Sequence, residues 1–385
     1  MNFTLHTRRR FLLANLHATC AMGILGVRGS VPEASAAASA GKEFIDLVKA
    51  DANHTRTGEA DIIAVGKDEL LMAFTDFRGW RDDASAVIRV CRSGDGGRSW
   101  TQPQVLIENE GRKNVASVSF QRLSPGNLLL FYGRKDSEKD TIIVVRRSHD
   151  DGRTFGPPSF CAPAGQYRGL CNDSAVRLKN GRIILPHTLK SHGTDPGTDV
   201  RLLAGSAYSD DQGHKWKLSN EVTLPKKTPG YGSGIMAEPK VVELKDGRLW
   251  MLTRTDQGFL GQSFSEDGGA SWAKADLSTI VAPQSPFIFK RIPTTGDLLM
   301  IRNPNVDLKH HHQGRRTPLR CTISSDEGRT WKHTRDLEDD LSFAWSYGSC
   351  TFVGDKAILT YYKELFEKPW HTLRVTRVPV SWIYG

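Results

Sequence analysis

The sequence predicts an all-β fold, a six-bladed β-propeller with four-stranded blades, from two repeated patterns and the composition. The first pattern, Ser-x-Asp-x-Gly-x-x followed by Trp or Phe, occurs five times, with first serines 55, 61, 56 and 59 residues apart. Such even spacing is typical of propellers and solenoids. The five copies begin at Ser93, Ser148, Ser209, Ser265 and Ser324.

Each copy has the chemistry of a β-hairpin turn. The Asp side chain can accept hydrogen bonds from backbone amides just after it, and the Gly supplies a positive φ angle. The terminal aromatic side chain can pack between neighbouring units. We therefore assign these turns to the scaffold and expect no chemistry from them.

A second repeat, out of phase with the first, opens six apolar runs of strand length. Six units, each with this early turn and five with the later Ser/Asp/Gly turn, give four strands apiece. The runs begin within Lys67–Leu71, Gly126–Leu129, Gly181–Ile184, Gly247–Trp250, Gly296–Leu299 and Lys356–Leu359.

The composition agrees with one β-rich domain over residues 41–385. The chain has 36 Gly and 18 Pro among 385 residues, and helix-period apolar patterns are hard to find. Without residues 1–40 the balance is 48 basic against 42 acidic residues, a net charge of +6 that suits an acidic ligand. No basic run is interleaved with aromatic residues, so the pattern argues against nucleic-acid binding.

Residues 1–40 are expected to be a twin-arginine-type signal peptide. Thr7–Leu12 contains three consecutive arginines, a mildly apolar stretch follows, and Ala36–Ala40 offers small-residue cleavage sites. The apolar stretch is short and interrupted by glycine, so we expect no stable membrane span after cleavage. The mature protein would be periplasmic or secreted. There, Cys161 and Cys171 can form a disulfide or stay as separate thiols.

The phase of the second repeat places polar residues at the centre of the propeller. The innermost strand of each blade lines the central channel, and ligands bind where those strands begin. Two acids, an amide and a phenol therefore converge on one opening, which favours a ligand site. The positions nine residues before the six turns are Glu59, Ser117, Asn172, Glu238, Phe287 and Tyr347.

Other charged residues are expected on the same rim, opposite the Ser/Asp/Gly turns. Arg254 ends the strand that returns beside Glu238, where it can pair with that acid or hold an anionic substrate. Arg315 and Arg316 precede the strand-like run 319–323. The loop 76–83 overhangs this face and contains Arg78, Arg81, Asp82 and Asp83.

These residues give the chain a resemblance to the bacterial sialidases, or neuraminidases, that contain BNR repeats, also called Asp-boxes. The resemblance covers about residues 55–365. The segment from Glu238 to Arg254 is similar to the one with the family's glutamate and second arginine, and Arg316 matches the third arginine. Tyr347 lies in a segment similar to that of the nucleophilic tyrosine. Asp82 falls where the family keeps its acid/base aspartate.

The resemblance implies an exo-acting glycoside hydrolase that releases a terminal sialic acid or related acidic sugar with retention. Tyr347 would be the nucleophile, because a carboxylate nucleophile would be repelled by the substrate carboxylate beside the anomeric carbon. Glu238 would take the phenol proton, Asp82 would protonate the leaving oxygen, and Arg254 and Arg316 would bind the carboxylate. An anionic glycan or glycoconjugate is the expected partner. No cofactor is expected.

One departure from the family concerns its first arginine, which belongs to an Arg-Ile-Pro segment. The aligned position is Gly58, followed by Glu59, whose charge would repel a carboxylate unless it is paired. Arg56, Arg78 or Arg81 can substitute, or only two arginines bind the substrate. The Arg291-Ile292-Pro293 segment leads into a blade-five turn, far from the rim.

Two further interpretations stay open. The protein can be a non-catalytic carbohydrate-binding propeller, or a propeller enzyme that acts on another polysaccharide. The candidate substrate-binding residues are Arg254, Arg316, Arg56, Arg78, Glu59 and Asn172. No metal site is expected, because the successive residues His310–His312 on a loop seldom point at one ion.

Overall fold

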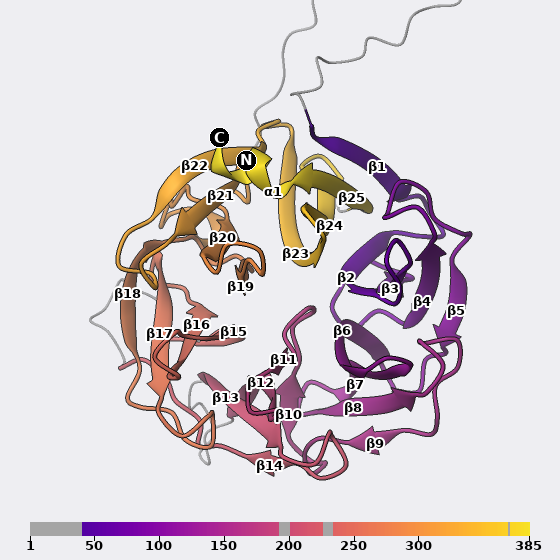
Figure 1. Ribbon diagram of the computed structural model, residues 1–385, viewed down its shortest axis with the longest axis horizontal. Helices are drawn as coiled ribbons and strands as arrows, with labels where there is room; N and C mark the ends of the chain where they lie inside the picture. The colour runs from indigo at the N-terminus through magenta and orange to yellow at the C-terminus, as the bar shows by residue number, and fades with distance from the viewer. Residues whose placement is uncertain (1–40, 192–200, 226–233, 369) are drawn as a thin grey trace, which may run out of the picture. The chain divides into compact units, whose positions relative to one another are not determined.

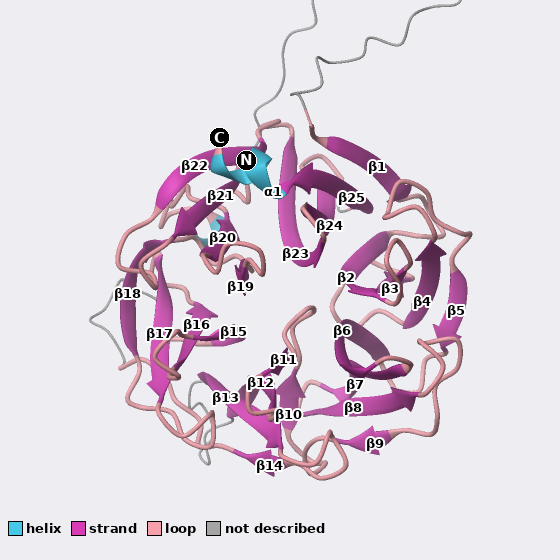
Figure 2. Ribbon diagram, in the orientation of Figure 1, coloured by secondary structure: helices cyan, strands magenta, loops and turns pink. Residues whose placement is uncertain are grey.

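The computed structural model describes residues 41–191, 201–225, 234–368 and 370–385, and this part of the chain is built almost entirely of β-strands. It contains 25 strands, the short helix α1 (Val380–Tyr384) and one 3-10 turn at His311–Gln313 (Figure 2). The all-β prediction is confirmed. The expected signal peptide, residues 1–40, lies outside the described residues. Within the described ranges, no helix is long and apolar enough to cross a membrane.

The strands form four sheets placed around a common centre (Figure 1). Two sheets have four strands each. One contains β15 (Ala237–Glu243), β16 (Leu249–Arg254), β17 (Phe259–Ser265) and β18 (Asp276–Val281). The other contains β19 (Ile288–Arg291), β20 (Leu298–Arg302), β21 (Leu319–Ser324) and β22 (Lys332–Glu338).

The other two sheets are larger. An eight-stranded sheet has the order β23 (Phe343–Val353), β24 (Lys356–Leu365), β25 (His371–Pro379), β2 (Arg56–Ala64), β3 (Leu70–Phe77), β4 (Ala86–Ser93) and β5 (Gln104–Ile107), with β1 (Glu43–Val48) beside β25. A nine-stranded sheet has the order β14 (Lys217–Leu218), β13 (Arg201–Ser209), β12 (Ile183–Ser191), β10 (Tyr167–Gly169), β8 (Asp140–Ser148), β7 (Asn127–Ser137) and β6 (Asn114–Ser124). Here β11 (Val176–Arg177) pairs with β12, and β9 (Ser159–Phe160) pairs with β8.

Each large sheet is interrupted by one narrow parallel contact. Strands β2 and β25 are paired only at Arg56 and His371, and β8 and β10 only at Thr141 and Tyr167. The other strand pairs are antiparallel, and most of them join consecutive strands, as hairpins do. The two large sheets are therefore each made of two antiparallel groups that touch at a single residue pair.

The Ser/Asp/Gly turns close on themselves through their own side chains. In all five copies the serine Oγ accepts the glycine N–H at 2.8 Å. The aspartate Oδ1 accepts the amide four residues on, at 2.8 to 2.9 Å. These bonds satisfy the carboxylate within the turn, which agrees with a scaffold role.

The two sequence repeats meet where neighbouring sheets pack. A Cβ atom on Gly152, in the second box, would lie 2.3 Å from a methyl carbon of Leu71 in the preceding sheet. On Gly328, in the fifth box, it would lie 2.2 Å from the ring of Trp250. Both glycines also have positive φ angles, so no other residue fits without strain. Leu71 and Trp250 occupy the same position of the second repeat in their respective sheets.

Helix α1 packs where a sixth box would lie. The group formed by β23, β24, β25 and β1 has no Ser/Asp/Gly turn, and the chain continues from β25 into α1. The Tyr384 hydroxyl bonds to Thr295 Oγ1 and to the Asp297 carboxylate, both at 2.7 Å, in the turn before β20. Trp382 packs in the same apolar cluster as Leu299, the counterpart of Leu71 and Trp250.

Candidate active site

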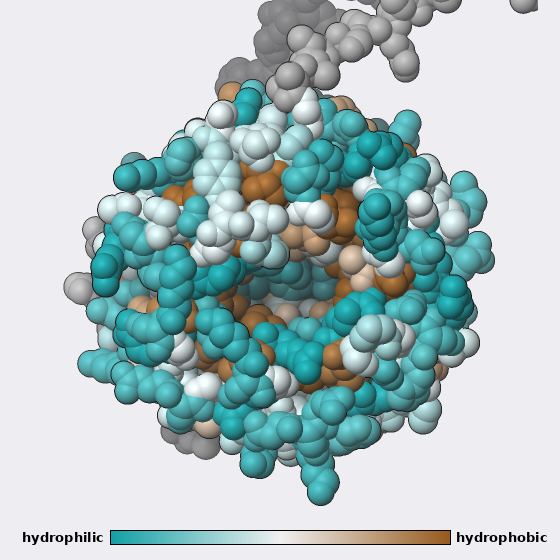
Figure 3. Space-filling model, in the orientation of Figure 1, coloured by the Kyte–Doolittle hydropathy of each residue, from teal (hydrophilic) through white to brown (hydrophobic). Residues whose placement is uncertain are grey.

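A cavity of about 860 Å³ lies among the inner strands of the sheets. Strands β2, β6, β15 and β23 lie near the centre in Figure 1, and Figure 3 shows the central hollow that the sheets surround. Its lining is rich in charged side chains of both signs. A polar, charged cavity of this size suits a sugar better than an apolar ligand.

Four residues project into this cavity from β-bulges in the inner strands. Glu59, Ser117, Glu238 and Tyr347 have left-handed backbones, with φ of 47°, 61°, 49° and 53°. The strand register shifts at each of them. Non-glycine residues in this conformation are strained, and bulges re-aim side chains next to functional sites. All four positions were found from the sequence by counting back from the turns.

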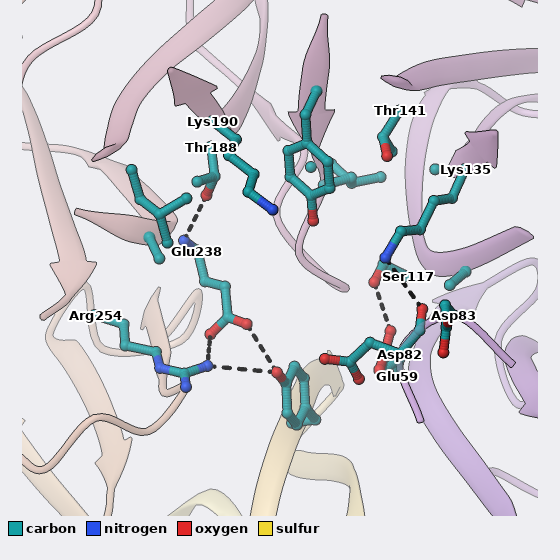
Figure 4. Close-up of a pocket in the computed structure, with 18 of the residues that line it drawn as sticks. Glu59, Asp82, Asp83, Ser117, Lys135, Thr141, Thr188, Lys190, Glu238 and Arg254 are labelled. Atoms are coloured by element: carbon teal, nitrogen blue, oxygen red, sulfur yellow. Dashed lines mark hydrogen bonds and ion pairs between the residues drawn. The ribbon is translucent and has the colours of Figure 1, made fainter. Parts of the chain in front are cut away.

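Tyr347 and Glu238 are in direct contact, and Arg254 joins both. Figure 4 shows Glu238 and Arg254 side by side in the cavity. The Tyr347 hydroxyl donates to Glu238 Oε1 at 2.8 Å. Arg254 Nη1 lies 3.0 Å from Glu238 Oε2 and 3.4 Å from the Tyr347 hydroxyl. The guanidinium carbon of Arg316 lies 5.7 Å from the centre of the Tyr347 ring. The sequence-predicted residues from three distant segments therefore meet at one point.

Burial and charge give Tyr347 and Glu238 opposite protonation states. Burial raises the pKa of the Tyr347 phenol well above its usual value, and the Glu238 charge adds to this rise. Burial also acts to raise the pKa of Glu238, but Arg254, the Tyr347 hydroxyl and the Arg316 charge together outweigh it and the pKa is lowered. At neutral pH the pair is thus a neutral phenol that donates to an ionised carboxylate.

Arg316 is a cation with few partners in the protein. Its one hydrogen bond, to Ser346 Oγ, is long at 3.5 Å, and its buried Nε has no partner among the described residues. Burial and the nearby Arg254 charge lower its pKa. An anion placed between the two guanidinium groups would relieve their mutual repulsion.

Arg56 is already saturated with partners from its own chain. It bonds to Asp82 at 2.7 Å, to Glu59 at 2.7 Å, to the Trp80 carbonyl at 3.1 Å and to the Tyr362 hydroxyl at 3.2 Å. Four of the five guanidinium donors are used by these bonds. Arg56 therefore has no free pair of donors for a bidentate bond to a substrate carboxylate.

Glu59, the residue that departs from the family pattern, is neutralised. It accepts bonds from Arg56, from the Ser117 hydroxyl at 2.6 Å and from the Tyr362 hydroxyl at 3.2 Å. Its side chain is only 5% exposed. The repulsion that its charge would exert on an anionic ligand is therefore offset only in part, because Arg56 also pairs with Asp82.

Asp82 projects from the loop after β3 into the cavity, and 86% of its side chain is exposed. Desolvation acts to raise its pKa, but the contact with Arg56 and the charges of Lys135 and Arg254 together outweigh this and lower it. Asp82 is therefore ionised near neutral pH. The loop is held by Arg56 and by Asn114, whose amide donates to the Asp82 carbonyl at 3.0 Å.

Three candidate substrate-binding residues, Arg78, Asn172 and Arg316, are absent from the cavity lining. Arg78 is exposed and donates to the Asn53 carbonyl at 3.0 Å, because its side chain leaves the loop on the outer side. Asn172 is buried, and its amide donates to the carbonyls of Ala60 and Tyr347 at 2.9 and 3.3 Å. Asn172 thus holds the backbone of the Tyr347 bulge by a hydrogen bond and does not face the cavity.

Several other sequence expectations are resolved by geometry. Arg81 lines the cavity but pairs with Asp83 at 3.0 Å. Arg291 pairs with Glu327 at 2.7 Å and is absent from the cavity lining. The five cysteines of the described ranges are all free and buried, Cys161 and Cys171 included. The described residues hold no cluster of three or more side chains suited to a metal ion.

Sequence reasoning missed a group on the far side of the cavity from Arg254. Lys135 from β7, Glu138 after it, Tyr167 from β10 and Lys190 from β12 all line the cavity. A signal for the lysines was available: each lies nine residues after its turn glycine, on the returning strand, close to the seven-residue offset of Arg254. Tyr362 from β24 was also missed as the partner of Glu59.

A family model for the BNR repeat-like domain matches residues 68–359, three quarters of the chain. The chain belongs to the BNR repeat-like family. This agrees with the five Ser/Asp/Gly turns and with the resemblance seen in the sequence. No curated protein matches the chain.

Solved structures similar to this BNR-repeat protein include sialidases and trans-sialidases. The intramolecular trans-sialidase of Ruminococcus gnavus, solved with oseltamivir carboxylate, is 15% identical with a TM-score of 0.67, over 88% of this chain and 98% of that one. The leech intramolecular trans-sialidase is 13% identical with a TM-score of 0.65, over 87% and 69%. A Dyadobacter fermentans protein of unknown function is 17% identical with a TM-score of 0.68, over 88% and 99%. At these identities the likeness shows a sialidase-like fold.

Proposed function

We propose that this protein is an exported, exo-acting glycoside hydrolase of sialidase type, which releases a terminal sialic acid or related acidic sugar with retention. The observation that supports this most is the 2.8 Å hydrogen bond from the Tyr347 hydroxyl to Glu238 inside a charged cavity. A buried phenol that donates to an ionised carboxylate has a base in place to activate it as a nucleophile.

The proposed architecture is a six-bladed propeller over residues 41–385, preceded by a twin-arginine-type signal peptide over residues 1–40. The two large sheets are each divided by a single parallel residue pair, and separating them there gives six antiparallel groups in all. Each group contains one early turn of the second sequence repeat. The signal peptide would place the mature protein in the periplasm or outside the cell.

In the proposed first step, the Tyr347 oxygen attacks the anomeric carbon while Glu238 accepts the phenol proton. The bond from the anomeric carbon to the leaving oxygen breaks as the protonated form of Asp82, the minor form at neutral pH while Arg56 lowers its pKa, gives that oxygen a proton. Arg254 and Arg316 hold the substrate carboxylate, which also relieves their mutual repulsion. Water then attacks the anomeric carbon as Asp82 accepts its proton, the bond to the Tyr347 oxygen breaks, and Glu238 returns the proton to that oxygen, so two inversions give retention.

The alternative functions are suggested by Gly58 and Glu59, which stand where the family has its first arginine segment. Because Arg56 is occupied by Asp82, Glu59 and Tyr362, two arginines and not three are left to bind a carboxylate. A cavity of this kind could bind a glycan without turnover, or act on another acidic polysaccharide.

The test is turnover of α-linked aryl sialosides, beside a panel of other acidic glycosides, by the mature protein and two variants. Tyr347→Phe should abolish release of the aryl group. The control Tyr132→Phe, a buried tyrosine that bonds to Glu110 outside the cavity, should keep full activity. Undiminished turnover by Tyr347→Phe would refute the nucleophile. Binding without turnover of any panel member would favour the carbohydrate-binding alternative.

A further inference from the structure

Two lysines share one carboxylate at the end of the cavity opposite Arg254. Lys135 Nζ lies 2.5 Å from Glu138 Oε1, and Lys190 Nζ lies 3.2 Å from Glu138 Oε2. Figure 4 shows both lysines pointing into the cavity, one from β7 and the other from β12. Within this group of three side chains, two positive charges therefore face one negative charge.

The three side chains differ in exposure. The lysine side chains are 10% and 21% exposed, whereas the Glu138 side chain is 60% exposed. The two lysine side chains are therefore held in the cavity wall, whereas the Glu138 side chain contacts them from the solvent side. An incoming anion can replace an exposed carboxylate at little cost, but buried ammonium groups left without any anion are costly.

Two further groups complete a binding surface beside the lysines. Thr141 is only 6% exposed, lines the cavity, and its Oγ1 has no hydrogen-bond partner among the described residues. The Tyr167 ring lies 5.6 Å from Lys190 Nζ and offers a flat apolar face. An aromatic face beside cations and a hydroxyl can accept a sugar ring that carries an acid group.

The position of Asp82 indicates which part of a substrate would reach this surface. Lys135 Nζ lies 3.4 Å from the backbone carbonyl of Asp82, so the lysine end adjoins the proposed acid. A group that protonates the leaving oxygen lies on the leaving-group side of the scissile bond. The next sugar of the glycan would therefore extend toward Lys135 and Lys190.

We infer that Lys135, Lys190, Thr141 and Tyr167 form a second anion subsite, which binds the carboxylate of an acidic leaving-group sugar. Glu138 occupies this subsite in the free protein and gives way when the substrate binds. The preferred substrate would then carry two carboxylates, one on each side of the scissile bond. The direction of the substrate rests on the proposed function, whereas the subsite rests on the lysine geometry.

The test compares two ligands by calorimetry in a Tyr347→Phe background, where turnover is blocked. The α2,8-linked sialic acid dimer has two carboxylates, and 3′-sialyllactose has one. Lys135→Met and Lys190→Met should each raise the Kd of the dimer by about tenfold or more, the scale of one charged hydrogen bond. The Kd of 3′-sialyllactose should stay within about twofold by the same scale.

Matched variants separate the subsite from general charge and folding effects. Lys139→Met removes an exposed lysine just past β7 that is absent from the cavity lining, and should change neither Kd. Glu138→Gln should tighten binding of the dimer alone, since it frees the lysines. Thermal unfolding identifies any variant that is merely unstable.

The possible outcomes distinguish a failure of the subsite from a failure of the proposed activity. Equal weakening of both ligands, or no weakening of either, would overturn the subsite while the proposed activity stands. If neither sialic acid ligand binds, digalacturonic acid, a diacid without sialic acid, is titrated next. Binding that depends on the lysines would retain the subsite and refute the sialic acid assignment, and no binding would refute the subsite.

Discussion

At the scale of single residues, two neighbours in the cavity differ in charge because burial acts on them with different partners. Tyr347 is held neutral by burial and by the adjacent carboxylate. Glu238 is held ionised by Arg254 in spite of the same burial. The proton thus lies on the phenol in the ground state and has an acceptor at 2.8 Å.

The change Glu238→Gln should lower kcat by about 10² to 10⁴-fold, because an amide cannot accept the phenol proton. Glu238 works as a base only when ionised, and its pKa is lowered, so native activity should fall only as the pH drops below the usual glutamate range. That acidic limb should be absent in the variant. The pH profiles of kcat measure this, and a retained limb would assign it to another group.

The double change Arg56→Met with Glu59→Gln tests whether Arg56 positions Asp82. It removes both charges of a buried pair, so neither is left alone. Arg56 lowers the pKa of Asp82, so its loss should raise that pKa. Asp82 would then stay protonated to higher pH, and the alkaline limb of kcat/KM should move upward.

Substrates with different leaving groups distinguish a role of Arg56 in positioning Asp82 from a role in binding the substrate carboxylate. A misplaced acid should reduce kcat for sialyllactose far more than for an aryl sialoside, whose leaving oxygen needs little protonation. A higher KM on both substrates with unchanged kcat would instead make Arg56 a substrate-binding residue. Arg78→Met, in the same loop but outside the cavity, is the control.

At the scale of elements, each Ser/Asp/Gly turn surrounds its aspartate carboxylate with hydrogen-bond donors from the same turn. The pKa of the aspartate is lowered in all five, and Thr154 donates both its hydroxyl and its amide to Asp150. A lowered folded-state pKa adds stability above the ordinary aspartate value, and this stability is lost as the pH falls through the folded value.

Asp150→Asn should therefore lower the thermal midpoint at pH 7, and its difference from the native protein should begin to shrink only as the pH falls below the ordinary aspartate value. The amide oxygen keeps some bonds of the turn but cannot be ionised. Thermal unfolding of both proteins from pH 7 to pH 3 gives the comparison, provided that unfolding is reversible. A difference between native protein and variant that stays constant with pH would contradict the linkage.

Local turn chemistry explains what the sequence could predict. A Ser-x-Asp-x-Gly turn makes its hydrogen bonds within five residues, so the sequence alone predicts where these turns lie and how they are spaced. The bulge positions followed from it, and Glu59, Ser117, Glu238 and Tyr347 indeed line the cavity. The partners of Arg56 did not follow, because Tyr362 is 306 residues away in the sequence. The role of Asn172 did not follow either, because its amide donates to the backbone carbonyls of Ala60 and Tyr347 and does not face the cavity.

At the scale of the whole described unit, β1 joins the last strand group of the chain. It pairs antiparallel with β25 from Glu43 to Val48. Arg374 of β25 bonds to Asp46 of β1 at 2.6 Å and to Glu338 of β22 at 3.2 Å. One buried arginine therefore connects strands from three distant parts of the chain.

Asp46→Asn should lower the free energy of unfolding by about 1.5–3 kcal/mol, the range for bonds to charged groups. Arg374 would lose its charged partner on β1 while it stays buried. The control Asp355→Asn removes an exposed acid whose pair with Lys356 spans 3.4 Å, and should cost at most about 1 kcal/mol. Denaturant unfolding measures both, and equal losses would mean that β1 is held by its backbone alone.

The pairing of β1 with β25 also has a consequence in time. Asp46 and Arg374 are 328 residues apart, and a ribosome adds about 5–20 residues per second, so β1 waits about 16–66 s for its partner strand to be made. During that interval its backbone hydrogen-bonding groups are open to other strands, including those of neighbouring nascent chains. The eight-stranded sheet is thus the last to be completed, and one of its strands stays unpaired during nearly all of the synthesis of the chain.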